Sequence, residues 1–221
     1  MKRPDMDQFV IVSDFDGTIT MEDSNDLLIE VCGNAENIEV EAAYTAGAYG
    51  NQETMSRHFE LLRISPEAYE DFLDRNIHID PGFDAFLQQA REKNTPFFIV
   101  SAGFRQGIER ILGEARLQGV QIFANDLQGE THLMPSFALE NVICTEGIGP
   151  CGNCKKVCID TIGRQTGRKI IYIGDGMTDR CTVQKADMLF AKDALAAYCQ
   201  AQGVPYIPFV SFSDVAHHLW G

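Results

Sequence analysis

The sequence DFDGT at residues 14–18, directly after the apolar run at 9–12, constrains the fold of this chain more than any other feature. The run predicts a buried strand, and Asp14 and Asp16, two positions apart, lie on the same side of it. Two like charges this close are unfavourable unless a cation or a shared proton relieves them. Open α/β sheets bind ligands at the carboxyl ends of their strands. The sequence therefore predicts a metal-assisted site with a carboxylate nucleophile.

Short apolar runs recur along the chain with helical patterns between them. The expected strands cover residues 9–13, 96–100, 169–173 and 187–190. Their uninterrupted apolar character suits strands that are buried on both faces of a parallel sheet. Asp80-Pro81 predicts the start of a helix, and an apolar stripe at helical spacing follows it, formed by Phe83, Phe86, Leu87 and Ala90. The alternation of strands and helices predicts an α/β fold with a doubly wound parallel sheet.

Residues 21–76 break this alternation, because they carry only helical patterns, and Ser65-Pro66 opens one of the helices. We therefore expect residues 1–20 and 77–221 to form the α/β core and residues 21–76 to form a helical cap over the carboxyl edge of the sheet. Closing such a cap would exclude water and bring in contacts to the substrate. Alternating polar and apolar residues at 121–139 predict a small hairpin.

The formal net charge of −14 argues against nucleic acid or an anionic membrane as a partner. No apolar stretch approaches the roughly 18–20 residues that a membrane span needs, and the first residues do not form a signal peptide. We therefore expect a cytoplasmic protein; the sequence leaves its oligomeric state open.

The chain has seven cysteines, an odd number, and no secretory signal, which predicts reduced thiols. Four of them cluster around a CxxC pair: Cys144, Cys151, Cys154 and Cys158. This cluster is compatible with a structural metal, with a redox pair or with plain buried thiols, and the sequence alone does not separate these interpretations.

Four short patterns occur in order, each at the boundary of an expected element. Asp14 and Asp16 follow the first strand, and Ser101 follows the second. Lys155 or Lys156 opens a helix, and the sequence GDGMTD at 174–179 follows the third strand. A parallel sheet would gather all four at one edge. Each pattern is weak alone, but the ordered set favours phosphoryl transfer.

The residue types fit that chemistry. A Mg²⁺ held by Asp14, Asp175 and a backbone carbonyl would offset the repulsion between a phosphate dianion and a carboxylate. Ser101 and nearby backbone N–H groups would bind phosphate oxygens, and a lysine would balance their charge. Asp14 would attack phosphorus to give an aspartyl phosphate. Asp16 would protonate the leaving alkoxide and then deprotonate the hydrolytic water.

The set of residues 14–18, Ser101, Lys155 and 174–179 resembles the four motifs of the haloacid dehalogenase superfamily, over nearly the whole chain. The resemblance implies a Rossmann-like core, Mg²⁺ and an aspartyl-phosphate mechanism. It also implies that the backbone carbonyl of Asp16 binds the metal and that Asp179 acts on it indirectly. The residues that it assigns to substrate binding in the core are Thr18, Ala102 and Gly103.

The helical insertion is similar to the cap of the phosphoserine-phosphatase-like branch of that superfamily. Within the branch, residues 14–21, 151–155 and 190–193 look most like the phosphatases of 2-hydroxy-3-keto-5-methylthiopentenyl-1-phosphate, which act in methionine salvage. In their pattern the lysine directly follows the cysteine, which favours Lys155 over Lys156. The resemblance implies that the partner is a small phosphorylated metabolite.

The chain also resembles phosphoserine phosphatases, but it departs from them in the cap. Where those enzymes carry a glutamate that meets the substrate amine, this chain has Asp23 beside Glu22, and their cap arginine falls off register near Arg57 and His58. Asp23, Arg57 and His58 are the candidate specificity residues of the cap, with Asp23 and Arg57 as the expected substrate-binding residues, although Arg57 and His58 are equally compatible with an exposed helix face. Phosphoserine, phosphoethanolamine and phosphocholine remain alternative substrates, and a phosphotransferase or a non-catalytic binding protein are alternative functions.

Overall fold

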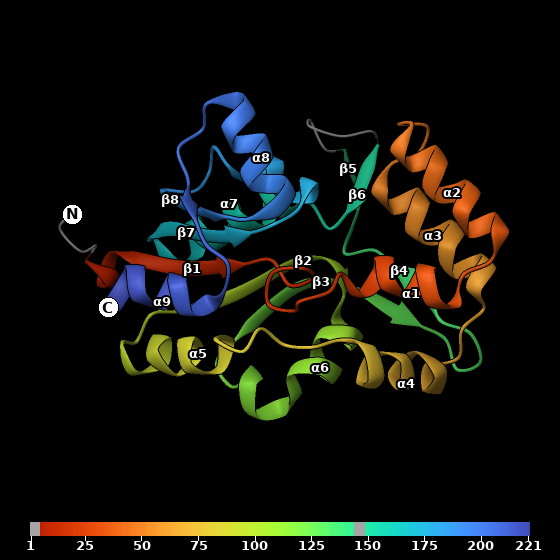
Figure 1. The fold of residues 1–221 in the computed structure, drawn as a ribbon, viewed down its shortest axis with the longest axis horizontal. Coiled ribbons are helices and arrows are strands. Elements are labelled where there is room, and N and C mark those ends of the chain that lie inside the picture. The colour runs from red at the N-terminus through yellow and green to blue at the C-terminus, as the bar shows by residue number, and fades with distance from the viewer. Residues whose placement is uncertain (1–4, 144–148) are drawn as a thin grey trace.

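The computed structural model describes residues 5–143 and 149–221. Its centre is a seven-stranded sheet in the order β4-β3-β2-β1-β7-β8-β9 (Figure 1). The strands pair in parallel, except that β4 is antiparallel to β3. This confirms the predicted doubly wound α/β fold. The strands of this sheet are β1 (Phe9–Ser13), β2 (Phe97–Phe104), β3 (Gln121–Gln128), β4 (Met134–Ser136), β7 (Lys169–Gly174), β8 (Met188–Ala191) and β9 (Ile207–Pro208).

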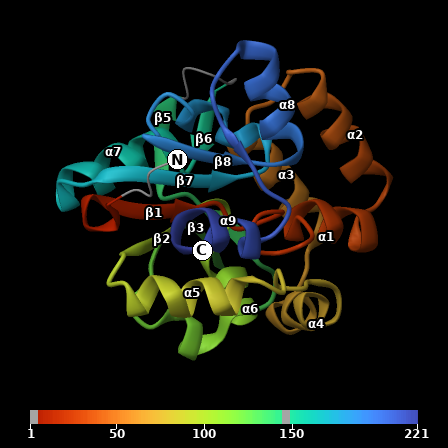
Figure 2. The ribbon, with the colours of Figure 1, turned by 60° about the vertical axis from the view of Figure 1, so that its left-hand side comes forward.

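Helices cover both faces of the sheet. One face carries α5 (Phe83–Glu92), α6 (Arg105–Leu117) and α9 (Phe212–Trp220), and the other carries α7 (Lys155–Thr166) and α8 (Asp193–Gln202), as Figures 1 and 2 show. Successive side chains of β1 alternate between the two layers, and all of them are buried. Burial on both faces explains why this strand reads as an uninterrupted apolar run.

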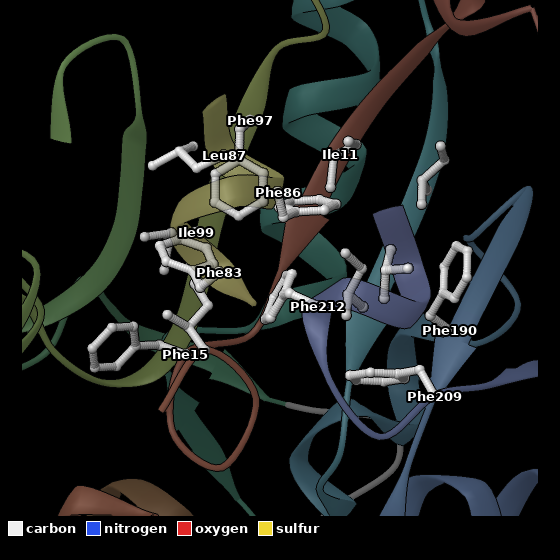
Figure 3. Packing of buried hydrophobic residues seen from close by; sticks show 14 of the residues in the cluster. Ile11, Phe15, Phe83, Phe86, Leu87, Phe97, Ile99, Phe190, Phe209 and Phe212 are labelled. Carbon is white, nitrogen blue, oxygen red and sulfur yellow. The ribbon is translucent and has the colours of Figure 1, made fainter. Parts of the chain in front are cut away.

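The core between the sheet and α5 and α9 is rich in phenylalanine (Figure 3). The ring centroids of Phe83 and Phe86 lie 5.0 and 4.8 Å from that of Phe212. The predicted apolar stripe of α5 is fully buried, but the predicted start of this helix is wrong: α5 begins at Phe83 and its N-cap is Gly82. Asp80 Oδ1 instead accepts hydrogen bonds from the backbone N–H groups of Gly82 and Phe212, which ties the starts of α5 and α9 together.

Residues 24–76 form four helices, named here the helical segment: α1 (Ser24–Cys32), α2 (Ala35–Thr45), α3 (Asn51–Leu62) and α4 (Pro66–Asn76). Ser65 caps α4, as its sequence predicts. Leu28 and Phe59 of the segment share an apolar cluster with Phe104 of β2 and Leu127 of β3. Figure 1 shows α1, α2 and α3 beyond the end of the sheet toward which β1 and β2 run.

The prediction of a separate small hairpin at residues 121–139 is wrong in one respect. β3 and β4 do pair as antiparallel strands, but β3 also pairs in parallel with β2 and belongs to the main sheet. It is only partly buried, so its sequence alternates like that of a hairpin strand. A separate two-stranded sheet, β5 (Leu139–Ile143) with β6 (Pro150–Gly152), was not anticipated. None of the described helices is long and apolar enough to cross a membrane.

Candidate active site

The site lies where the strand order reverses, between β1 and β7. β2 leads away from β1 on one side and β8 away from β7 on the other, and ligands of doubly wound sheets bind in the crevice at such a switch point. Asp14 directly follows β1, and Asp175 directly follows β7. Together with Asp179 they form a group of carboxylates whose oxygens lie within 4.8 Å of one another. Such a group of hard oxygen ligands fits a divalent cation.

Lys155, the first residue of α7, lies inside this group. Its Nζ is 2.5 Å from Asp14 Oδ2 and 2.6 Å from Asp179 Oδ1, and its side chain is 2% exposed. Burial disfavours the ammonium, but the charges of Asp14 and Asp179 outweigh that effect and raise the pKa of Lys155 well above its usual range. Lys156, next along the helix, is only half-buried, so Lys155 is the lysine that lies among the aspartates.

Asp179 is buried and makes hydrogen bonds through both carboxylate oxygens. Oδ1 accepts from the Tyr172 hydroxyl at 2.5 Å, besides the contact to Lys155. Oδ2 accepts from the backbone N–H groups of Asp175 and Gly176, each at 3.1 Å. Asp179 thereby fixes the loop that carries Asp175. Sequence reasoning missed Tyr172, because it stands in the apolar run of a buried strand and carries no signal of its own.

The carboxylates of this group repel one another. Burial raises the pKa of Asp14 well above its usual range, and the charge of Asp179 adds to the effect. Burial and Asp179 likewise raise the pKa of Asp175 to about 6. A divalent cation bound here would offset that repulsion and favour the ionised carboxylates, so the residues present fit a metal ion.

Asp16 lies in a different environment. Its Oδ1 accepts hydrogen bonds from the backbone N–H and the hydroxyl of Ser24, at the start of α1. Its Oδ2 lies 3.4 Å from the Ser101 hydroxyl and 3.5 Å from Asn25 Nδ2. Burial, then the charge of Asp23, raises the pKa of Asp16 to about 7. The two aspartates of DFDGT therefore differ in their partners, since Asp14 is paired with the ammonium of Lys155 and Asp16 with neutral donors from Ser24 and Ser101.

Glycines allow the backbone to approach these carboxylates. A Cβ on Gly103 would lie 2.6 Å from Asp16 Oδ2, and one on Gly174 would lie 2.5 Å from Asp179 Oδ2. At Gly17 a Cβ would lie 2.5 Å from Asp175 Oδ2, and the backbone φ of +69° favours glycine as well.

The core residues expected to bind substrate hold the site together in this structure. Thr18 is fully buried, and its hydroxyl donates to Asp175 Oδ1 at 2.5 Å. The Ala102 carbonyl accepts from Asn125 Nδ2, and the Gly103 N–H donates to the Ser101 hydroxyl. The sequence places Ser101 at the end of its strand. In the structure β2 instead continues to Phe104, past an irregularity after Val100.

A second residue that sequence reasoning missed is Asn153, inside the CxxC stretch. Its Nδ2 donates to the carbonyls of Ser101 and Phe123, at 2.8 and 2.9 Å, and so ties the start of α7 to β2 and β3. Its Oδ1 accepts from the thiol of Cys158.

The cysteine cluster does not form a metal site in the described part of the chain, where the only group of three potential ligands is the aspartate group. Burial raises the pKa of Cys158 to about 12, so this thiol is a packing and hydrogen-bonding group. Cys154 is also buried, whereas Cys144 lies outside the described residues.

The candidate residues of the helical segment do not all lie at this site. Asp23 is the N-cap of α1 and accepts from the N–H groups of Asn25 and Asp26, beside the residues that hold Asp16. Burial, then the charge of Asp23, raises the pKa of the neighbouring Asp26 to about 7, a residue that sequence reasoning missed. The guanidinium of Arg57, by contrast, lies 2.8 Å from Glu53 and stacks on the ring of Tyr49.

The suggestion that His58 lies on an exposed helix face is wrong. Its side chain is fully buried between α2 and α3, where it contacts Asn37 and Glu41.

A comparison with known families matches residues 11–184 to the model of haloacid dehalogenase-like hydrolases, from β1 through the loop after β7. The chain belongs to this family. The matched region contains the aspartate group, Lys155, Asp16 and the whole helical segment.

Curated relatives of this haloacid dehalogenase-like hydrolase include several phosphatases. The 2-hydroxy-3-keto-5-methylthiopentenyl-1-phosphate phosphatase of Exiguobacterium sp. is 31% identical over 96% of this chain and 97% of that protein. Its counterpart from Geobacillus kaustophilus is 32% identical over 96% of each chain. The polyol phosphate phosphatase PYP1 of Saccharomyces cerevisiae is 28% identical over 93% of this chain and 90% of that protein. This family member is accordingly a phosphatase.

Solved structures of phosphoserine phosphatases share its fold. A phospho-aspartyl intermediate analogue of phosphoserine phosphatase has a TM-score of 0.72 at 17% identity and covers 95% of this chain and 98% of that one. A substrate-bound phosphoserine phosphatase has a TM-score of 0.71 at 17% identity and covers 99% of both chains. At this identity the likeness concerns the fold and not the substrate.

Proposed function

We propose that this phosphatase hydrolyses 2-hydroxy-3-keto-5-methylthiopentenyl-1-phosphate, with Mg²⁺ as cofactor and a covalent phospho-aspartate on Asp14. The observation that carries the proposed chemistry is the buried contact of Lys155 with Asp14 and Asp179 beside Asp175. The substrate is proposed from the two relatives named for it, which are 31% and 32% identical over nearly the full chain.

In this proposal the carboxylates of Asp14 and Asp175 and the backbone carbonyl of Asp16 hold Mg²⁺. The bound ion supplies positive charge that offsets the repulsion between the phosphate and the carboxylates. Asp179 acts indirectly, because both of its oxygens already accept hydrogen bonds from protein groups. Thr18 orients Asp175 through its hydroxyl.

Asp14 is the proposed nucleophile. A bond forms between its carboxylate oxygen and phosphorus while the bond from phosphorus to the substrate alkoxide breaks. Phe15 N–H and Lys155 Nζ fix the orientation of the Asp14 carboxylate, at 2.7 and 2.5 Å. Lys155 remains an ammonium and also balances the charge of the phosphate, whose oxygens are bound by Ser101 and by N–H groups of residues 101–103 near the end of β2.

Asp16 is the proposed general acid and base. Its proton passes to the leaving alkoxide, and its carboxylate then takes a proton from the water that attacks the phospho-aspartate and restores Asp14. A pKa of about 7 suits both roles, since the group can exchange its proton near neutral pH. Ser24 and Ser101 hold its carboxylate on both sides.

We also propose that residues 21–76 act as a cap on a core formed by residues 1–20 and 77–221. The contact between Ser24 and Asp16 supports this, because it joins the first helix of the segment to the proposed acid. Cap closure would shield the phospho-aspartate and leave one water for its hydrolysis.

The test is release of inorganic phosphate in the presence of Mg²⁺ and without an added acceptor. The panel contains 2-hydroxy-3-keto-5-methylthiopentenyl-1-phosphate, phosphoserine, phosphoethanolamine and phosphocholine. We expect the first compound to have the highest kcat/KM, EDTA to abolish turnover and Mg²⁺ to restore it. A higher kcat/KM for another compound would refute the substrate, and full activity after EDTA dialysis would refute the metal. A phosphotransferase would release inorganic phosphate only slowly, and an added acceptor alcohol would speed consumption of the substrate by giving a new phosphomonoester instead of inorganic phosphate.

A further inference from the structure

Strand β2 loses its regular pairing with β3 beside the candidate active site. The register is regular up to Val100 and resumes at Phe104. Residues 101–103, named here the bulge, thus lie opposite a single residue of β3, Ala124. Bulges turn backbone groups away from the strand that would otherwise bind them, and they are common next to active sites. Because Ser101 is the proposed phosphate-binding hydroxyl, the direction of the backbone groups in the bulge bears on catalysis.

Two buried asparagines bind the carbonyls of the bulge. Asn153 Nδ2 donates to the Ser101 carbonyl at 2.8 Å and to the Phe123 carbonyl of β3 at 2.9 Å. Asn125, a residue of β3, donates from Nδ2 to the Ala102 carbonyl at 2.8 Å. Asn125 is 0% exposed and Asn153 2%, so solvent does not compete for these bonds. Both carbonyls are therefore held on the side of β2 that faces β3.

The two carbonyls point the same way, unlike those of a regular strand. There the carbonyls of successive residues point toward opposite neighbouring strands. Both peptide units are planar and trans, so each N–H points opposite to the carbonyl of its own unit. The N–H groups of these units belong to Ala102 and Gly103. Since β2 lies between β3 and β1, both N–H groups turn away from β3 and toward the β1 side.

That direction leads to the proposed acid and base, which follows β1. The Gly103 N–H donates to the Ser101 hydroxyl at 2.9 Å, and this hydroxyl lies 3.4 Å from Asp16 Oδ2. A Cβ on Gly103 would lie 2.6 Å from the same oxygen, so the backbone of the bulge directly approaches Asp16. Successive N–H groups that point to one side form a concavity that binds anions.

We propose that Asn125 and Asn153 are positioning residues, which bind the two carbonyls of the bulge and thereby aim the N–H groups of Ala102 and Gly103 at the phosphate oxygens of the substrate. N–H groups held in advance stabilise the charge of the transferring phosphoryl group without first having to reorient. This inference rests on the proposed function, because it takes the phosphate to lie between Asp14 and the bulge.

An asparagine suits this role because its amide donates hydrogens without adding a charge to the site. Asn153 uses both hydrogens on carbonyls, and its Oδ1 accepts from the Cys158 thiol at 3.2 Å. The Oδ1 of Asn125 accepts from the Ala138 N–H at 3.3 Å. Each amide is therefore fixed at both ends, and it fixes in turn the carbonyl that it binds.

The first test replaces each asparagine by leucine, which has a similar size and no hydrogen-bond donor. The carbonyl is then free to turn, and the N–H group of the same peptide unit turns with it. We expect Asn125→Leu and Asn153→Leu to lower kcat/KM for 2-hydroxy-3-keto-5-methylthiopentenyl-1-phosphate about 10- to 100-fold. The inhibition constant of inorganic phosphate should rise at least about threefold. Asn125→Leu is the cleaner variant, because Asn153 lies only two residues before Lys155.

Cys158→Ala is the matched control. It removes the thiol that bonds to Asn153 Oδ1, and it leaves in place the donors that bind the carbonyls. We expect a lower melting temperature, because a buried side chain is truncated, while kcat/KM and the inhibition constant of phosphate stay within about threefold of wild type. Equal losses of kcat/KM in Cys158→Ala and Asn153→Leu would indicate a general loosening of the core and would overturn the positioning role.

The second test observes a proposed donor directly. The dipeptide Ser-Ala occurs once in the sequence, at residues 101–102. Serine labelled with ¹³C at the carbonyl and alanine labelled with ¹⁵N therefore select the Ala102 N–H as a single NMR signal. We expect saturating inorganic phosphate with Mg²⁺ to move this amide proton downfield in wild type, through a hydrogen bond to the anion, and to move it less in Asn125→Leu. A merely structural role of Asn125 would lower thermal stability and leave this movement unchanged.

The two proposals fail in different ways. The inference is overturned if phosphate inhibits competitively while the Ala102 signal of wild type stays in place, or if folded Asn125→Leu keeps its kcat/KM. Thermal unfolding shows whether that variant is folded, and the wild-type signal decides if it is not. Absence of turnover of 2-hydroxy-3-keto-5-methylthiopentenyl-1-phosphate by wild type, together with absence of inhibition by phosphate, would instead refute the proposed function.

Discussion

Two groups of carboxylates, one in the sheet core and one in the helical segment, are held in opposite ways. Asp14 and Asp179 are buried and share the ammonium of Lys155. In the helical segment Glu41 is partly exposed, and its partner is the buried imidazole of His58. The first arrangement suits chemistry, since it fixes charge in a dry place, whereas the second leaves a carboxylate partly open to solvent. The two groups should therefore respond differently to substitution.

The largest expected effect is that of Asp14→Asn. The amide is a poor nucleophile and cannot form the phospho-aspartate, so we expect kcat to fall by at least about 10⁴-fold. Phosphate release from the lead substrate measures it, after mass spectrometry has excluded deamidation back to aspartate. Activity within tenfold of wild type would show that Asp14 is not the nucleophile and that the carboxylates of the sheet core do not carry out the chemistry.

Lys155→Met is expected to affect stability as well as activity. It leaves Asp14 and Asp179 buried without their cation, and breaking a buried pair on one side costs about 3–5 kcal/mol. Urea denaturation without divalent cations measures this loss. Lys156→Met is the control, and we expect it to change the free energy of unfolding by less than about 1 kcal/mol because that side chain is only half-buried. Equal losses in both variants would argue against the special role of Lys155.

Gly103→Ala should impair activity more than stability. The new Cβ would lie 2.6 Å from Asp16 Oδ2 and 3.2 Å from Ser101 Oγ, so the proposed acid must move. A displacement near 1 Å can cost about 100-fold in rate, and we expect kcat to fall about 10- to 100-fold. Gly163→Ala in α7 is the control, since its Cβ meets nothing within 4 Å and an alanine stabilises a helix by about 0.5–1 kcal/mol. Unchanged kcat in Gly103→Ala would show that the position of Asp16 is not critical.

The sequence was informative where local pattern and topology act together. The first strand was predicted with the bounds it has, and the order of strands and helices was enough to bring Asp14, Ser101, Lys155 and Asp175 to one edge of the sheet. The expected helix start at Asp80 was wrong because the carboxylate has a second, distant partner at Phe212. Such tertiary hydrogen bonds leave no trace in the local sequence.

The contacts that support the site were harder to predict. Tyr172 stands in an apolar run, and only its hydroxyl, aimed at Asp179, distinguishes it from a core residue. The hydrogen-bond chain from Asn37 through His58 to Glu41 joins two helices, and its existence depends on how these helices face each other. Helical periodicity predicts the faces of each helix separately but not their mutual rotation, so Arg57 and His58 could not be told apart as exposed and buried.

The smallest expected effect is that of Arg57→Ala, and it sharpens the comparison within one helix. Arg57 and His58 are adjacent in α3, yet the guanidinium contacts Glu53 and Tyr49, while the imidazole contacts α2. An exposed pair of this kind contributes little to stability because solvent screens it, so we expect the thermal unfolding midpoint to stay close to that of wild type and kcat/KM for the lead substrate to stay within about twofold. Steady-state kinetics and thermal unfolding measure both quantities. If Arg57→Ala instead raised KM more than tenfold, the substrate would contact this side of α3, and the description of Arg57 as one half of an exposed surface pair would be wrong.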